Sequence, residues 1–459
     1  MNITKIDAFT DHSSTQNFSG AMLFQAGKAC MLYAQGHCLL LDSELAYRIK
    51  DGKIPEKLII PLRSRGFLGS LRYQDTKSCQ LVRPEFFMID MTDRCNMKCK
   101  YCLRDVQSVG RSIQTATLKE ICQYIQDYCD QEHLRDVSIQ PWGGEPLLEL
   151  EAILNMKEWI APAHTRVHFS IETNAILLTP EVINKLYQAK IGIGISIDGD
   201  QTCHDQQRVL VSGEPTHTLV VQHLKQAAKI YGKRLGTITT ITRLNYLHIE
   251  DILEYFAVNL GLTNVKFNFV HQSHFADCEE LCLTPEEISS TVLRMLNKLT
   301  ELITRGYPIV EKNILTKIKN LLFNEYSDIC LSKGCCGGRK MIVFDMDGNI
   351  FPCELTDFPK ESMGSIFQNE RDLISLIHNA IRTRTYFTPK RAEKCVDCPW
   401  SYFCEGGCTV RIMNSGNQPP AIDDIECAVN IALYPAIVEL VLTRPDVINT
   451  MLGEQVIIL

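Results

Sequence analysis

Six apolar runs between residues 85 and 270 alternate with amphipathic stretches, and this alternation constrains the fold more than any other feature. The runs, which we expect to be strands, are 85–92, 136–140, 167–172, 191–197, 236–242 and 264–270. Helices are expected between them, at 117–132, 148–160, 180–189, 217–231 and 247–259. Strands that alternate with helices form a parallel sheet covered by helices. The sequence therefore predicts an α/β fold in which six repeats form a partial (β/α)6 barrel.

Three cysteines follow the first predicted strand, in the segment Cys95-Asn-Met-Lys-Cys99-Lys-Tyr-Cys102. Thiolates with this spacing can bind three irons of one [4Fe–4S] cluster. The fourth iron then has no protein ligand and can bind a small molecule. A zinc knuckle is the alternative, although zinc sites usually recruit four protein ligands. Because parallel barrels present their loops at the C-terminal ends of the strands, chemistry is expected at this loop.

This strand and loop resemble the cluster loop of the radical S-adenosylmethionine (SAM) enzymes. The resemblance implies that SAM chelates the fourth iron through its amino and carboxylate groups. One electron then splits the sulfonium and yields a 5′-deoxyadenosyl radical, which is chemistry of the cofactor. The resemblance also implies that the six-repeat barrel is the radical SAM core.

Polar motifs after the later strands strengthen the resemblance. Gly143-Gly144-Glu145 follows the second predicted strand and matches the family's Gly-Gly-Glu motif, which holds the amino group of SAM. Glycine allows a close approach of the backbone to a ligand. The third strand ends in Glu172-Thr173-Asn174 and the fourth in Ser196-Ile-Asp198-Gly.

Four further residues acquire roles only through the resemblance. Ser196 and Asp198 would lie near the ribose of SAM, and Arg208 would reach its carboxylate. Tyr101 occupies the position at which the family packs an aromatic ring near the adenine. As an alternative, Thr173-Asn174 and Asp198-Gly199 are ordinary turn residues.

Composition limits the class of protein. The chain has 459 residues, 45% hydrophobic and 22% charged, as is ordinary for a globular enzyme of two or three domains. A net charge of −7 argues against broad binding of nucleic acid. No apolar run is long enough for a membrane span, and no signal peptide is apparent. Twenty cysteines without a secretion signal indicate metal or thiol chemistry in a reducing compartment, so we expect a cytoplasmic protein.

Residues 1–80 read as a separate α+β unit. Short apolar runs at 23–25, 29–33 and 37–41 are expected to form β-hairpins, followed by helices at 43–50 and 55–65. This order resembles the small winged-helix domains of enzymes that modify ribosomally made peptides. Such domains bind a leader peptide as an added strand. A structural cap on the barrel is an equally good interpretation.

A second cysteine set occupies the C-terminal third, after helical stretches at 284–305 and 311–324. Its spacing, Cys395-x2-Cys398-x5-Cys404-x3-Cys408, resembles the SPASM domain, which holds two auxiliary [4Fe–4S] clusters. By that resemblance the first auxiliary cluster takes Cys330, Cys336, Cys353 and Cys408. The second takes Cys395, Cys398, Cys404 and Cys427. Cys335 beside Cys336 leaves that ligand ambiguous, and two zinc knuckles are the alternative to iron. Elsewhere, Cys122 and Cys129 fall on the apolar face of the helix at 117–132 and are expected to be packing residues.

The domains expected from these patterns are 1–80 (N-terminal unit), 81–283 (barrel), 284–329 (helical bridge), 330–430 (SPASM) and 431–459 (C-terminal helix or tail). Glu354 follows Cys353 at the position of a catalytic aspartate in sulfatase-maturing enzymes, and is a candidate base by that resemblance. A salt-bridged residue beside a cluster is the alternative.

The function that the resemblance implies is oxidative modification of a ribosomally made precursor peptide, with a carbon–carbon or carbon–heteroatom cross-link as product. The cofactors would be SAM and three [4Fe–4S] clusters. The partners would be the precursor peptide and an electron donor such as flavodoxin or ferredoxin, without nucleic acid or membrane. A formylglycine-generating sulfatase maturase is the nearer alternative, and a non-catalytic iron–sulfur or zinc scaffold is the more distant one.

Overall fold

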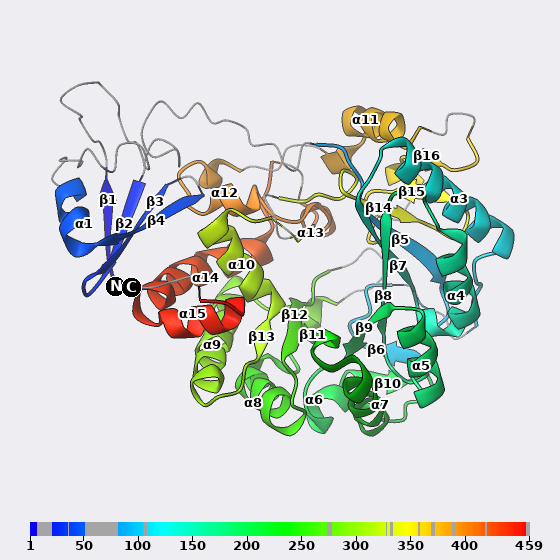
Figure 1. Ribbon diagram of the computed structural model, residues 1–459, viewed down its shortest axis with the longest axis horizontal. Helices are drawn as coiled ribbons and strands as arrows, with labels where there is room; N and C mark the ends of the chain where they lie inside the picture. The colour runs from blue at the N-terminus through cyan, green and yellow to red at the C-terminus, as the bar shows by residue number, and fades with distance from the viewer. Residues whose placement is uncertain are drawn as a thin grey trace.

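The computed structural model describes residues 1–6, 21–34, 36–50, 81–104, 106, 109–272, 278–326, 328–330, 334–356, 359–368, 372–387, 392–417 and 420–455. In Figure 1 the barrel occupies the right half of the molecule and a small sheet made by the N-terminal residues lies at the far left. Helices from the C-terminal half lie between the two.

Six parallel strands form the barrel wall in the order β5, β7, β8, β9, β11, β12. Their bounds are β5 Phe86–Thr92, β7 Asp136–Gly143, β8 Arg166–Thr173, β9 Ile191–Ser196, β11 Gly236–Ile241 and β12 Asn264–Phe269. The helices between them are α3 Thr115–Gln131, α4 Leu150–Trp159, α5 Pro180–Gln188, α7 His217–Tyr231 and α8 Ile249–Glu254, the last continued by a π-helical turn, Tyr255–Asn259. The predicted α/β barrel is confirmed.

Residues alternate between the two faces of the barrel wall, so that one face packs in the core and the other faces the barrel interior. On β9, Ile191, Ile193 and Ile195 are fully or almost fully buried, whereas Gly192, Gly194 and Ser196 are only partly buried. The apolar face of α3 is buried in the same core, and Cys122 and Cys129 are 0% exposed there. Their predicted role in packing is confirmed.

The barrel sheet continues beyond the six predicted strands. β13 (Val310–Glu311) pairs with β12, and β14 (Met341–Phe344) pairs in parallel with β5. β15 (Asn349–Phe351) and β16 (Gly364–Ser365) extend the edge further as antiparallel strands, which makes a ten-stranded sheet. The cysteine-rich third and the barrel therefore share one hydrogen-bonded sheet, an arrangement that the sequence pattern did not predict.

The N-terminal unit is an antiparallel sheet in the order β1, β2, β3, β4, with bounds Asn2–Ile6, Ala21–Ala26, Ala29–Ala34 and His37–Asp42. The predicted hairpins are present, and β1 is an additional strand. Helix α1 (Ser43–Lys50) begins where predicted, because the Asp42 carboxylate accepts a hydrogen bond from the Leu45 amide at 2.8 Å. The predicted helix at 55–65 lies outside the described residues.

Aromatic side chains of this unit pack against the cysteine-rich third. Tyr33 lies 5.0 Å from Trp400 between ring centroids, and its hydroxyl donates to the Pro399 carbonyl at 2.8 Å. Trp400 in turn stacks on Tyr434 of α14 (Asp424–Thr443) at 5.2 Å. The N-terminal sheet is therefore packed against the core of the molecule.

Helix α14 lies at the centre of the C-terminal half and contacts α9 (Pro285–Thr304), α10 (Lys312–Phe323) and α15 (Pro445–Leu452). Among the described residues it is the one helix whose length and composition would suit a membrane span, and 56% of that stretch is buried within the protein. This composition is typical of a core helix. Because α14 is continuous from residue 424 to 443, the predicted domain boundary at 430/431 is wrong.

Candidate functional site

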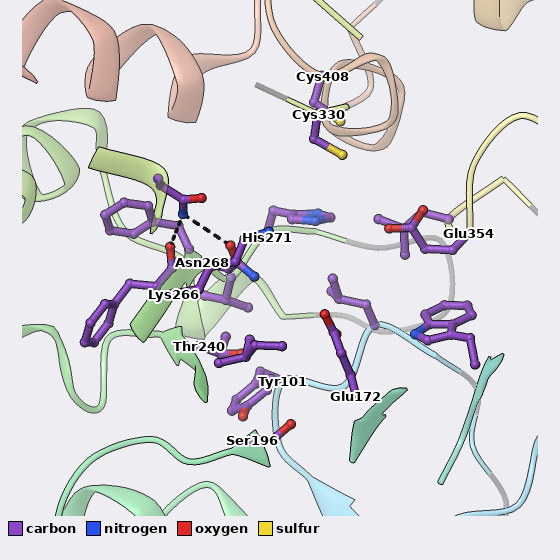
Figure 2. Close-up of a pocket in the computed structure, with 18 of the residues that line it drawn as sticks. Tyr101, Glu172, Ser196, Thr240, Lys266, Asn268, His271, Cys330, Glu354 and Cys408 are labelled. Atoms are coloured by element: carbon purple, nitrogen blue, oxygen red, sulfur yellow. Dashed lines mark hydrogen bonds between the residues drawn. The ribbon is translucent and has the colours of Figure 1, made fainter. Parts of the chain in front are cut away.

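A cavity of about 680 Å³ opens at the C-terminal ends of the barrel strands. In Figure 2, Tyr101 and Ser196 lie on one side of it and Cys330 and Cys408 on the opposite side. Lys266, Asn268 and Glu172 lie between these two groups. The cavity therefore connects the predicted SAM site with one of the predicted auxiliary sites.

The three loop cysteines, Cys95, Cys99 and Cys102, all line this cavity. Strand β6 (Met97–Cys99) carries the middle of the loop and pairs with β10 (Arg208–Leu210), so that Cys99 lies opposite Arg208. Burial raises the pKa of Cys95 to about 11 and that of Cys99 to about 12. The charge of Cys102 contributes to both shifts, and Arg208 opposes them. The loop thus brings the predicted ligands together.

The Gly-Gly-Glu segment holds the cluster loop through its backbone. Gly144 donates its amide to the Thr92 carbonyl at 2.7 Å, and the Glu145 amide donates to the Arg94 carbonyl at 2.9 Å. A Cβ atom on Gly144 would lie 2.1 Å from that same Arg94 oxygen. Gly143 has φ +133°, which favours glycine. These glycines are required for close contact with the protein's own loop.

Glu145 belongs to a buried hydrogen-bond network that connects the Gly-Gly-Glu segment, Thr173-Asn174 and the cluster loop. Its carboxylate accepts hydrogen bonds from the Thr173 hydroxyl at 2.7 Å and from the Asn174 amide at 2.9 Å. The Asn174 side chain donates to Asn96 in the cluster loop at 2.7 Å and reaches the Cys95 sulfur at 3.8 Å. Burial raises the pKa of Glu145, while these hydrogen bonds oppose the rise. A carboxylate so placed can receive an ammonium group at the cavity wall.

Asp198 lies behind the cavity wall. It is 0% exposed, accepts from the Tyr101 hydroxyl at 2.5 Å and the Thr240 amide at 3.0 Å, and forms an ion pair with Arg208 at 3.9 Å. The Arg208 guanidinium also donates to the Tyr101 hydroxyl. Tyr101, Ser196 and Arg208 line the cavity, whereas Asp198 is absent from its lining. In this geometry Asp198 orients Tyr101 and Arg208.

The surroundings of Cys335 and Cys336 differ, although the two residues are adjacent. Cys330, Cys335, Cys353 and Cys408 line the cavity, and the charges of Cys335 and Cys408 act on the thiols of both Cys330 and Cys353. Cys336 is 2% exposed and does not line the cavity. Cys335 therefore shares the cavity with Cys330, Cys353 and Cys408, and the choice between Cys335 and the predicted Cys336 as the ligand stays open.

Members of the predicted second auxiliary set influence one another electrostatically, and their role as cluster ligands stays a prediction. The charge of Cys395 acts on the thiols of both Cys404 and Cys427, and that of Cys398 also acts on Cys427. Burial raises the pKa of Cys404 to about 12. Its four members, Cys395, Cys398, Cys404 and Cys427, come from the segment before α12 (Ser401–Cys404), from α12 itself and from α14.

Glu172, Lys266 and His271 are cavity residues that sequence analysis did not select. The Glu172 side chain is accessible from the cavity, yet the surrounding protein raises its pKa by desolvation. Lys266 opposes that rise and Glu354 adds to it, so Glu172 lies near both. Glu354 accepts a hydrogen bond from the Cys353 thiol at 3.1 Å. Glu172 could have been found from its place in the Glu-Thr-Asn segment, as the side chain that alternates with Thr173.

The donor types fit the groups that the sequence implies. Thiols are the usual ligands of [4Fe–4S] clusters. The buried Nε atom of Arg208 has no hydrogen-bond partner among the described residues, as expected where a ligand carboxylate completes the site. Within the described parts of the chain, no three His, Cys, Asp or Glu side chains surround one point as ligands of a single metal ion do. The fit therefore rests on the donor chemistry and on the grouping of the thiols.

Comparisons with known proteins agree with this geometry. Residues 89–260 match the model of the radical SAM superfamily. A cysteine-type anaerobic sulfatase-maturating enzyme of Clostridium perfringens is 22% identical over 339 residues, which cover 68% of this chain and 85% of that enzyme. The subtilosin biosynthesis protein AlbA of Bacillus subtilis is 23% identical over 347 residues, or 74% of this chain and 70% of that protein.

Two solved structures share the fold at low sequence identity. The anaerobic sulfatase-maturating enzyme anSMEcpe, with AdoMet and a Cp18Cys peptide bound, has a TM-score of 0.66 at 18% identity and covers 81% of this chain and 100% of that one. SuiB of Streptococcus suis, bound to its precursor peptide SuiA, has a TM-score of 0.55 at 15% identity, with 88% and 98% covered. The chain contains a radical SAM domain at residues 89–260 and is related to maturases of sulfatases and of a bacteriocin.

Proposed function

We propose that this protein is a radical SAM enzyme that oxidatively cross-links a ribosomally made precursor peptide. The observation that carries the proposal is the single cavity that the loop cysteines share with the first auxiliary set. A peptide segment in that cavity would lie between the site of radical formation and a site that accepts an electron. Relatives that mature a bacteriocin and bind a precursor peptide support the same reaction class.

The catalytic cofactors would be held by residues described above. Cys95, Cys99 and Cys102 would bind the cluster, and Glu145 would accept the ammonium of SAM. Arg208 would pair with the SAM carboxylate, and Tyr101 and Ser196 would border the adenosine. When bound, these cofactors supply a 5′-deoxyadenosyl radical that removes a hydrogen atom from the substrate.

Two auxiliary clusters complete the proposal, with Cys330, Cys335, Cys353 and Cys408 as ligands of the first. Cys395, Cys398, Cys404 and Cys427 would bind the second. Clusters held by four thiolates suit electron transfer.

Glu354 is the proposed acceptor of the proton released when the cross-link forms, and Glu172 is a second carboxylate that lines the same cavity. Desolvation by the surrounding protein raises the pKa of Glu172, so this carboxylate is a second candidate for holding a proton in the cavity. Lys266 limits the negative charge of the site.

The N-terminal unit is proposed to bind the leader of the precursor, and a cytoplasmic flavodoxin or ferredoxin to supply electrons. The docking of Tyr33 on Trp400 would carry the leader site close to the second auxiliary set. The revised domains are 1–80, 81–283, 284–329 and 330–452, because α14 crosses the earlier boundary.

Mass spectrometry of short peptides encoded beside the gene, each co-expressed without oxygen, tests the proposal. Loss of two hydrogens per site is expected, with no loss for Cys95→Ala. The second candidate is a sulfatase maturase, favoured by the sequence similarity to such enzymes. Conversion of a sulfatase-type cysteine peptide to an aldehyde, with no change in the neighbouring peptides, would establish that alternative.

A further inference from the structure

Four charged side chains, three of them buried and Arg411 partly buried, form a chain of contacts between the two auxiliary cysteine sets. They are Lys317 of α10, Arg411 of α13 (Thr409–Asn414), Asp423 at the start of α14 and Glu426 within α14. Lys317 is 1% exposed, Asp423 2% and Glu426 6%. Charges are rarely buried to this extent unless they are paired.

Glu426 is the centre of this buried network. One of its oxygens accepts from the Lys317 ammonium at 2.7 Å and from the Asn430 amide at 3.0 Å. The other oxygen lies 3.8 Å from the Arg411 guanidinium. Asn430 also accepts from Lys317 at 2.6 Å. One carboxylate therefore faces a cation on each side.

Each end of the network reaches a different cysteine set. Asp423 accepts from the Arg411 guanidinium at 2.8 Å and from the Cys408 amide at 2.9 Å, and the charges of both residues act on the Cys408 thiol. At the other end, the charges of Glu426 and Lys317 act on the Cys404 thiol. Cys408 belongs to the first set and Cys404 to the second.

Packing alone does not explain the arrangement. Well-packed apolar side chains of similar volume often stabilise a protein as well as a buried ion pair, or better. The two cations and two carboxylates balance, so removal of one charge leaves a net charge beside both cysteine sets. Charge that is buried near a cluster changes its reduction potential.

We propose that Glu426 couples the two auxiliary clusters electrostatically, its negative charge lowering the reduction potential of both. This inference rests on the proposed function, since it requires both clusters to be present. Glu426 acts in this role by its own charge, and its contacts with Lys317 and Arg411 hold that charge between the two sets.

Redox titration followed by electron paramagnetic resonance tests the inference in protein that carries only the auxiliary clusters, made by replacing Cys95, Cys99 and Cys102 with alanine. The Glu426→Gln variant is expected to move both midpoint potentials to more positive values. Glu439→Gln is the matched control, because Glu439 lies on the same helix and its side chain is 54% exposed. It should leave both potentials unchanged.

Lys317→Met gives a second and opposite test. It removes a cation from the same network, so both potentials should become more negative. A residue needed only for packing would not give shifts of opposite sign in the two variants. If the Glu426→Gln variant binds iron poorly, the direction in which Lys317→Met moves the two midpoint potentials decides whether the inference holds.

Iron content distinguishes failure of this inference from failure of the proposed function. Normal iron with one or both potentials unmoved, or moved in the wrong direction, overturns the coupling and leaves the proposed function standing. Absence of iron from the parent protein removes the auxiliary clusters from the proposed function, and this inference with them.

Discussion

Two neighbouring thiols, Cys335 and Cys336, show how much a ligand set depends on the direction of single side chains. Cys335 faces the cavity and lies 2.9 Å from the Tyr386 hydroxyl, whereas Cys336 is enclosed by the protein core. Spacing along the chain is nearly the same for both, so sequence could not separate them. The turn that follows them requires glycine at positions 337 and 338, where Cβ atoms would meet Tyr386 and Phe387.

Replacement of these two cysteines distinguishes their roles. Cys335→Ala is expected to lower the iron content by about four atoms per chain, the content of one [4Fe–4S] cluster. Cys336→Ala should retain the iron and lose only roughly 1 kcal/mol of folding free energy, as is common for core substitutions. Iron and acid-labile sulfide analysis measures the difference. Equal iron loss in both variants would contradict the assignment.

The carboxylates of the cavity allow a second residue-scale prediction. Glu172→Gln and Glu354→Gln should each keep SAM cleavage but lower the rate of peptide modification on the order of 100-fold, since positioned acid–base groups contribute 10²–10⁴-fold. The two rates are measured together, as 5′-deoxyadenosine and as modified peptide. If 5′-deoxyadenosine formation falls in parallel with product, these side chains serve SAM binding instead.

At the scale of elements, the cluster loop and the Gly-Gly-Glu segment pack so closely that position 144 has no space for a side chain. Gly144→Ala would force the Arg94 carbonyl away and break the adjoining backbone hydrogen bond, at a cost of about 1–3 kcal/mol. The loop cluster should then be lost while the auxiliary iron is kept. Gly236→Ala is the matched control, because nothing lies within 4 Å of its Cβ position. Undiminished SAM cleavage by Gly144→Ala would refute the constraint.

Ion pairs on the outside of the barrel connect α8 with α9. Glu254 accepts hydrogen bonds from Arg305 at 2.7 Å and pairs with Lys298 at 2.8 Å, and these contacts lower its pKa to about 2. Because the pKa falls on folding, the stabilisation is complete above pH 4.5 and is lost as the pH falls towards 2.

Glu254→Gln is therefore expected to lower the free energy of unfolding by about 0.5–1 kcal/mol, the upper range for exposed ion pairs. Chemical denaturation of the iron-free protein should show the same difference at pH 7 and pH 5. A difference that already shrinks between those values would contradict the assigned pKa shift. High salt should weaken the effect.

Sequence predicted the elements with local periodicity and missed those that exist only through distant partners. The six barrel strands and their helices were predicted because each buries one face of its own repeat. β14 has four buried residues, Met341–Phe344, and no alternation that distinguishes it from a loop. Glu172 was missed although the Glu-Thr-Asn segment contains it, and its proximity to Lys266 arises only when the barrel forms.

At the scale of the whole molecule, the barrel is incomplete without the cysteine-rich third. A chain that ends at residue 329 would lack β14 and leave the edge of β5 without its partner. An exposed parallel edge of apolar residues favours aggregation. Such a fragment is expected to be insoluble or to elute as large aggregates in size-exclusion chromatography, whereas a soluble monomer would show that β14 is dispensable.

The pairing of β5 with β14 also sets an order of events during synthesis. β5 begins at Phe86 and leads directly into the loop of Cys95, yet its neighbour begins only at Met341. Most of the chain has therefore left the ribosome before the strand that presents this loop gains its second partner. Iron that is inserted only after β5 has both neighbours is therefore inserted after Met341–Phe344 has been made.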